Sequence, residues 1–83
     1  FVDVDMKHFC ITTENIKNAI TSNTKAIVMV HALGFNGITD ELVQLCKEKN
    51  ILLIEDVCES HGTTYKNIKV GNYGYASNFS FYF

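Results

Sequence analysis

Proline and tryptophan are absent from the 83 residues, and cysteine occurs only three times. Without proline, no segment carries the fixed backbone angle that breaks helices and stiffens linkers. Cys10, Cys46 and Cys58 are odd in number and form no Cys-x-x-Cys pair, which argues against a disulfide framework and a paired-cysteine zinc site. A reduced, cytoplasmic setting is the simplest interpretation of this cysteine usage.

Long apolar runs and basic clusters are also missing. No stretch approaches the roughly 18 apolar residues that indicate a membrane helix, so no membrane partner is predicted. Seven Lys and Arg residues are scattered among nine Asp and Glu residues, for a net charge of −2. A nucleic-acid surface needs a basic stripe, so nucleic acid is not a predicted partner either. The dinucleotide fingerprint Gly-x-Gly-x-x-Gly and the Walker motif do not occur.

Hydrophobic residues make up 47% of the chain, enough for a packed core, and they alternate between strand and helix patterns. The apolar runs within 26–33 and 51–56 do not alternate with polar residues, which predicts strands covered on both faces. Shorter strands are expected at 1–5 and 76–83. Two sets of apolar side chains recur at helical spacing between the strands. They are Ile16, Ala19 and Ile20, and Ile38, Leu42, Leu45 and Cys46.

The predicted order is therefore β-α-β-α-β with short connections. This order favours right-handed crossovers and a mainly parallel sheet in a three-layer α/β domain. Thr12 or Thr13 can cap the first helix and Thr39 the second, while residues 63–71 read as a surface hairpin. A domain of this size buries only about 60% of its unfolded surface, so its stability alone would be marginal. The chain begins on FVDVD without an initiator Met and stops on NFSFYF, so we expect residues 1–83 to be an internal fragment. Its missing neighbours should cover sheet edges that are bare here.

Asp56 lies at the predicted carboxyl end of the strand 51–56. Ligands of open α/β sheets bind beyond the carboxyl ends of the strands, so this carboxylate is a ligand-facing candidate. Two interpretations stay open, a structural cap and a fixed negative charge aimed at a ligand. Glu55 should point to the opposite face, because side chains alternate along a strand.

Further candidates follow Asp56 or lie at neighbouring strand ends. Glu59 and His61 could orient a ligand hydroxyl or belong to a solvated loop. His31 either reaches the same crevice as Asp56 or is a satisfied core histidine. Ser80 could donate to a phosphate.

Cys58 lies among these residues but is a poor nucleophile candidate. The neighbouring acids disfavour its thiolate, so buried filler is the plainer interpretation. A metal site formed by Asp56, Cys58 and His61 is a weak alternative, because structural zinc sites show paired ligand clusters.

Two sequence blocks, together with their spacing, carry a resemblance over essentially the whole chain. Residues 54–62 read Ile-Glu-Asp-Val-Cys-Glu-Ser-His-Gly, and residues 79–82 read Phe-Ser-Phe-Tyr, with Tyr-Lys-x-x-x-Val-Gly between them at 65–71. With FVDVD and TKAIVMVHALG upstream, this combination resembles the DegT/StrS family of sugar-nucleotide aminotransferases. These are pyridoxal-phosphate enzymes of the aspartate-aminotransferase fold. The resemblance implies that residues 1–83 are a fragment of the large, cofactor-binding domain.

The resemblance also implies roles for individual residues. Asp56 matches the aspartate that pairs with the pyridine nitrogen of the cofactor and keeps it protonated, so that the ring can act as an electron sink. Glu59 matches a position, often Gln, that contacts the ring hydroxyl, and Ser80 matches a serine that binds the phosphate. His61 matches a family histidine without an assigned role. The Schiff-base lysine falls on the second residue beyond Phe83, so the catalytic residue lies outside the chain.

Two activities remain open within this resemblance. One is transamination of a keto-sugar nucleotide by an amino-acid donor, in amino-sugar or surface-polysaccharide biosynthesis. The other is 3-dehydration through pyridoxamine phosphate, with histidine in place of the lysine. The sequence differs from the usual aminotransferase pattern at residues 31–34, at Cys58–Glu59 and at Tyr75, and these differences favour the dehydratases. Transamination, on the other hand, is the commoner chemistry of the family.

Two further expectations complete the interpretation. The resemblance implies a homodimer with shared active sites. A flavodoxin-like binding module is the non-enzymatic alternative, since it also has a β-α-β-α-β order, but it would carry its acidic cluster after the first strand.

Overall fold

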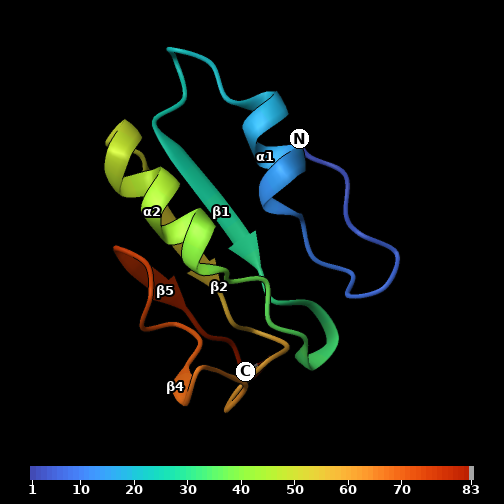
Figure 1. Ribbon diagram of the computed structural model, residues 1–83. Coiled ribbons are helices and arrows are strands. Elements are labelled where there is room, and N and C mark those ends of the chain that lie inside the picture. The colour runs from blue at the N-terminus through green and yellow to red at the C-terminus, as the bar shows by residue number, and fades with distance from the viewer. Residues whose placement is uncertain (83) are drawn as a thin grey trace.

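The computed structural model describes residues 1–82, which are built on a three-stranded parallel sheet (Figure 1). The sheet has the order β1, β2, β5, with β2 in the centre. A separate antiparallel pair, β3 with β4, forms the hairpin predicted at 63–71. The elements are α1 (Thr13–Ala19), β1 (Ala26–Val30), the 3-10 turn η1 (Ala32–Gly34), α2 (Asp40–Lys49), β2 (Leu52–Asp56), β3 (Thr64–Tyr65), β4 (Ile68–Lys69) and β5 (Ala76–Asn78).

The register of the sheet confirms the predicted α/β class with parallel strands. β1 pairs with β2 from Ala26 opposite Leu52 to Val30 opposite Asp56. β2 pairs with β5 from Ile54 opposite Ala76 to Asp56 opposite Asn78. All three strands therefore end at one edge of the sheet, and Asp56 lies at that edge.

Both helices begin at caps that the sequence predicts, Thr12 and Thr39. The Thr12 hydroxyl accepts a hydrogen bond from the Asn15 backbone N–H at 3.1 Å, and the Thr39 hydroxyl accepts one from Leu42 at 3.0 Å. These bonds satisfy N–H groups that have no partner within the first helical turn. Asn50 ends α2 in the left-handed conformation, with φ of 53°. Both helices are thus fixed at their N-termini by local chemistry.

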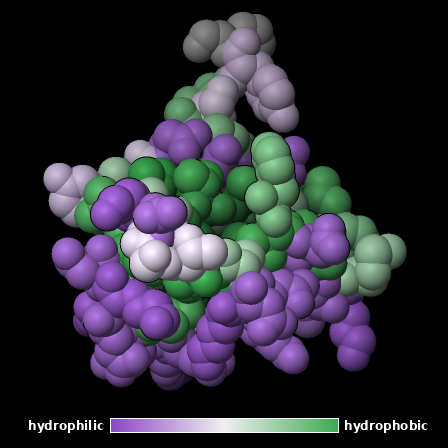
Figure 2. All heavy atoms as spheres, turned by 90° about the horizontal axis from the view of Figure 1, so that it is seen from above, coloured by the Kyte–Doolittle hydropathy of each residue, from purple (hydrophilic) through white to green (hydrophobic). Residues whose placement is uncertain are grey.

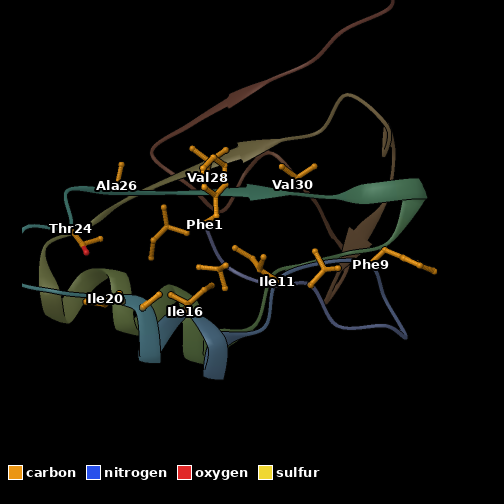
Figure 3. A pocket seen from close by; sticks show the side chains of 13 residues that line it. Phe1, Phe9, Ile11, Ile16, Ile20, Thr24, Ala26, Val28 and Val30 are labelled. Carbon is orange, nitrogen blue, oxygen red and sulfur yellow. The ribbon is translucent and has the colours of Figure 1, made fainter.

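The helices cover one face of the sheet and leave the other bare. In Figure 3 both helices lie on the same side of the strands, while Val28 and Val30 point to the other side. Seen from above in Figure 2, hydrophobic residues gather in the middle of the molecule and hydrophilic residues line one side. The core on the covered face consists of Cys10, Ile16, Ile27, Met29, Ile38, Leu42, Leu45, Cys46, Ile51 and Leu53.

The prediction that both faces of the strands are covered is therefore wrong for the described residues. Val28 is 54% exposed, Val30 47% and Leu52 46%. An uninterrupted apolar run indicates that both faces of a strand can be buried. The helices within residues 1–82 pack against only one of these faces.

Three predicted strands are shorter than expected. Residues 1–5 form no strand and make a single antiparallel bridge between Val4 and Ile11. The strand predicted at 26–33 stops at Val30, since Leu33 and Gly34 take positive φ angles of 54° and 87°. The strand predicted at 76–83 ends at Asn78, and Phe83 lies outside the described residues.

None of the helices in residues 1–82 has the length and hydrophobicity needed to cross a membrane.

Candidate functional site

Two neighbouring carboxylates at the end of β2 point to opposite faces of the sheet. Glu55 is fully buried on the face that the helices cover, as strand alternation predicts. Asp56 is half-buried on the bare face, opposite Val30 of β1 and Asn78 of β5. Only Asp56 is therefore placed to meet a ligand at the carboxyl edge.

Glu55 is held by four hydrogen bonds. Its Oε1 accepts from the Gly71 N–H at 2.8 Å, and its Oε2 accepts from the N–H groups of Tyr73 at 2.8 Å and Gly74 at 2.7 Å. The fourth bond joins Oε1 to Nε2 of His31 at 3.1 Å. A buried carboxylate needs this degree of hydrogen bonding to offset its desolvation. Glu55 thus ties the turn before β5 to the middle of the sheet.

His31 is a fully buried, hydrogen-bonded histidine of the core. Its Nδ1 accepts a hydrogen bond from the Gly37 N–H at 3.0 Å, so the ring proton of the neutral imidazole lies on Nε2 and is donated to Glu55. Burial lowers the pKa of His31, against the opposing effect of Glu55. The structure places His31 on the Glu55 face and does not bring it onto the face of Asp56.

Asp56 has its own set of hydrogen bonds. The backbone N–H of Cys58 donates to Oδ1 of Asp56 at 3.1 Å. Hydrogen bonding with Cys58, through its side chain first and then its backbone, holds the pKa of the Asp56 carboxyl below its usual value, and Asn78 acts in the same direction. Asp56 is therefore an anion at neutral pH, which suits a cationic ligand group.

Glu59 lies in a loop that is bound to the turn after β1. Its Oε2 accepts from the Leu33 N–H at 3.0 Å, and the Ser60 hydroxyl accepts from the Gly34 N–H at 3.0 Å. The Thr63 hydroxyl donates to the Gly34 carbonyl at 2.8 Å. Together these bonds fix the loop 57–63 against η1, so Glu59 is held at the same edge as Asp56.

Ser80 lies just beyond β5, and His61, in the loop after β2, packs against the same segment. Ser80 follows the last residue of β5 by two positions, is exposed, and accepts a hydrogen bond from the Tyr82 N–H at 3.2 Å. Because β2 and β5 are parallel neighbours, Ser80 and Asp56 belong to one edge of the sheet. The His61 ring packs against the rings of Phe79 and Phe81, with centroids 5.5 and 4.6 Å apart. His61 is thus part of an aromatic cluster in the described structure.

Two other arrangements do not mark a site. Among residues 1–82, no three His, Cys, Asp or Glu side chains gather closely enough to hold a metal ion, so Asp56, Cys58 and His61 do not form the alternative metal site. A cavity of about 590 Å³ lies between α1, β1 and residues 1–11, and its lining is apolar apart from Thr24 (Figure 3). It offers no charged group to orient a polar ligand.

Sequence reasoning missed two contributors to this edge. The hydrogen bonds of Glu55 to the turn 71–74 and the placement of Asn78 beside Asp56 depend on contacts between distant residues. The Gly-Asn-Tyr-Gly turn was a visible signal for the first. For the second, an Asn inside a predicted strand was the signal, because Asn is depleted in strands.

Comparisons with known proteins agree with one another. Residues 1–83 match the DegT/DnrJ/EryC1/StrS aminotransferase family. A GDP-4-keto-6-deoxy-D-mannose 3-dehydratase of Escherichia coli O55:H7 is 39% identical over 83 residues, which are 100% of this chain and 21% of the relative.

Solved structures give the same result. An aminotransferase of Psychrobacter cryohalolentis is 40% identical with a TM-score of 0.94, over 98% of this chain and 20% of that one. The E. coli dehydratase with bound hydrated PLP is 40% identical with a TM-score of 0.82, over 89% of this chain and 19% of that one. The chain thus spans about a fifth of these relatives, and an aminotransferase and a dehydratase are both 40% identical to it.

Proposed function

Because the chain belongs to the DegT/DnrJ/EryC1/StrS aminotransferase family, we propose that residues 1–83 are part of the cofactor-binding domain of a pyridoxal 5'-phosphate enzyme. The enzyme acts on a keto-sugar nucleotide. Asp56 pairs with the pyridine nitrogen of the cofactor, Ser80 binds its phosphate and Glu59 contacts its ring hydroxyl. The single observation that carries this proposal is the anionic Asp56 on the bare face at the carboxyl edge of the sheet.

The residues at this edge fit such a cofactor. The cofactor supplies a protonated ring that withdraws electrons from the substrate. Asp56 is the matching anion, because its low pKa keeps it charged at the pH where it must hold a proton on the ring nitrogen. Ser80 lies at the end of the neighbouring parallel strand, on the same edge as Asp56. Its exposed hydroxyl is free of the core and can donate to a phosphate oxygen.

Transamination is the proposed reaction, with an amino acid as donor and a homodimer as the assembly. The family description and the aminotransferase neighbour support it. Dehydration at C3 is the second candidate, because dehydratases match the chain with the same identity. The second residue beyond Phe83 separates the two, with lysine for transfer and histidine for dehydration.

The proposal is tested by Asp56→Ala in the complete enzyme that contains this segment. We expect turnover to fall about 100-fold or more, as when an electrostatic stabiliser of the transition state is removed. Far-ultraviolet circular dichroism should stay unchanged, because Asp56 is not a core residue. Asp3→Ala, an exposed aspartate far from β2 in sequence, is the matched control and should leave turnover unaffected. Wild-type turnover in Asp56→Ala would refute the assignment.

A further inference from the structure

We infer that Asn78 is a positioning residue that holds the Asp56 carboxylate in the orientation needed to pair with a protonated ring nitrogen. This inference rests on the proposed function and deepens it, because it adds a residue from β5 to the site at the end of β2. Asn78 does not touch the reacting atoms. Asn78 acts on Asp56 through Cys58, which lies between the two side chains.

The sheet register brings Asn78 to Asp56. The two residues are Cα partners in the parallel pairing of β2 with β5, so their side chains leave the sheet on the same, bare face. The backbone is locked at this point, since the Val57 N–H donates to the Asn78 carbonyl at 3.0 Å. The Asn78 side chain therefore starts from a fixed position next to the carboxylate.

A short chain of contacts joins the two side chains. The Asn78 Nδ2 donates to Sγ of Cys58 at 3.2 Å, and the Cys58 N–H donates to Oδ1 of Asp56 at 3.1 Å. Cys58 is thus held from both sides, and the amide and the thiol both lie beside the carboxylate. This arrangement restricts rotation of the Asp56 side chain, which otherwise would lie on an open face of the sheet.

The electrostatics agree with the geometry. Asn78 adds to the hydrogen bonding with Cys58 that lowers the pKa of Asp56. Asp56 in turn raises the pKa of the Cys58 thiol, so the thiol stays neutral beside the carboxylate. His31 is the other titratable group that acts on Asp56, and it is buried on the opposite face. The neighbouring groups therefore favour the ionised form of the Asp56 carboxyl.

A purely structural role for Asn78 is less consistent with its position. Asn is among the residues depleted in strands, and Asn78 is exposed at the end of β5. A strand residue chosen for packing or propensity would be β-branched or aromatic. The amide of Asn78 is explained by its hydrogen bond to Cys58.

The test compares two ligands in the complete enzyme without substrate. One is pyridoxal 5'-phosphate, and the other is its carbocyclic analogue, in which C–H replaces the ring nitrogen. The ratio of the two dissociation constants, measured by absorbance titration, reports the pairing of Asp56 with the nitrogen. A general loss of structure would weaken both ligands and leave the ratio unchanged.

Wild-type protein should prefer the natural cofactor, and Asp56→Asn should abolish that preference. Asn78→Ala should reduce the preference about fivefold, which is the effect of one net hydrogen bond. Asn78→Leu, which has a similar volume without a donor, should behave like Asn78→Ala, and Asn78→Ser should restore part of the preference. Asn72→Ala is the matched control, because Asn72 donates only to the Lys69 carbonyl in an exposed turn.

The outcomes separate the two levels of the argument. A preference that survives Asp56→Asn overturns the proposed role of Asp56 and the inference with it. A preference lost in Asp56→Asn but intact in both Asn78→Ala and Asn78→Leu overturns the inference alone. As a second readout, loss of the preference on acidification should begin at higher pH in Asn78→Ala, because Asn78 lowers the pKa of Asp56.

Discussion

Glu55 and Asp56 are consecutive carboxylates with opposite environments. Glu55 has no exposed surface, and both of its oxygens accept hydrogen bonds, from backbone N–H groups and from His31. Asp56 lies on the bare face and accepts a hydrogen bond from the Cys58 N–H. Two consecutive acids thus have different surroundings, one joining segments of the fold and the other partly exposed on the bare face. The alternation of side chains along β2 is sufficient to separate them.

Replacement of Glu55 by Gln should lower the free energy of unfolding of the complete enzyme by about 2–4 kcal/mol. An amide has one oxygen, so at least one side of the group would present N–H to the N–H donors of Gly71 or of Tyr73 and Gly74. Urea denaturation measures the change. Glu48→Gln should be nearly neutral, because Glu48 is exposed and accepts only from Gln44. A stability equal to wild type in Glu55→Gln would contradict this account.

Residue positions were predictable where they depend on the local chain. The opposite orientation of Glu55 and Asp56 follows from strand alternation, and the caps Thr12 and Thr39 follow from their position before an apolar periodic segment. The hydrogen bonds of His31 with Glu55 and Gly37 join residues 24 and 6 positions apart. Such contacts require the folded register, which the sequence alone does not fix.

At the scale of elements, the turn before β5 determines where the end of that strand lies. Glu55 binds its backbone at Gly71, Tyr73 and Gly74, and the Tyr75 N–H donates to the Leu53 carbonyl at 2.7 Å. The turn approaches β2 so closely that a Cβ on Gly74 would lie 2.5 Å from the Leu53 carbonyl oxygen. Glycine at 74 is therefore a requirement of close approach.

Gly74→Ala should destabilise the complete enzyme by about 1–3 kcal/mol and reduce cofactor affinity, since β5 would have to move away from β2. Thermal unfolding and absorbance titration measure the two effects. Gly62→Ala is the control for backbone strain alone, because Gly62 has φ of +85° with no atom within 4 Å of a Cβ. It should cost about 1 kcal/mol and reduce affinity less than Gly74→Ala does. Equal affinity in Gly74→Ala and wild type would show that β5 tolerates the shift.

The order of elements was predictable, and their extents were less so. The helical stripe of Ile38, Leu42, Leu45 and Cys46 is buried as its spacing predicts. The strand expected to continue to Leu33 ends at Val30, because Leu33 and Gly34 donate their N–H groups to Glu59 and Ser60. Those partners lie in a loop 26 residues away, so local hydrophobicity could not reveal the end of the strand.

At the scale of the whole molecule, the described residues leave hydrophobic surface open. The outer edge of β1 pairs with no strand in residues 1–82, and Val28, Val30 and Leu52 are about half exposed on the bare face. An unpaired edge strand beside apolar side chains is a site for association with other chains. The expectation that further chain covers these edges in the complete protein stays a prediction.

The 83 residues produced alone should therefore associate or remain partly unfolded at micromolar concentration. Size-exclusion chromatography with light scattering measures the mass, and circular dichroism measures the folded fraction. Val28→Lys, which places a charge on the bare face of the edge strand, should reduce association. Lys25→Gln, an exposed position before β1, is the control and should not. A monomer with a cooperative unfolding transition would contradict the prediction.

The opposite orientation of the Glu55 and Asp56 side chains also restricts insertions and deletions within β2. Deletion or insertion of one codon within 52–54 would turn each acid to the other face of the sheet, so that Asp56 would point into the core and Glu55 onto the bare face. The shorter acid could not span the donors of the turn, and the longer one would not reproduce the contact of Asp56 with Cys58. Length variation during divergence is therefore expected in the hairpin 63–71 and not in β2.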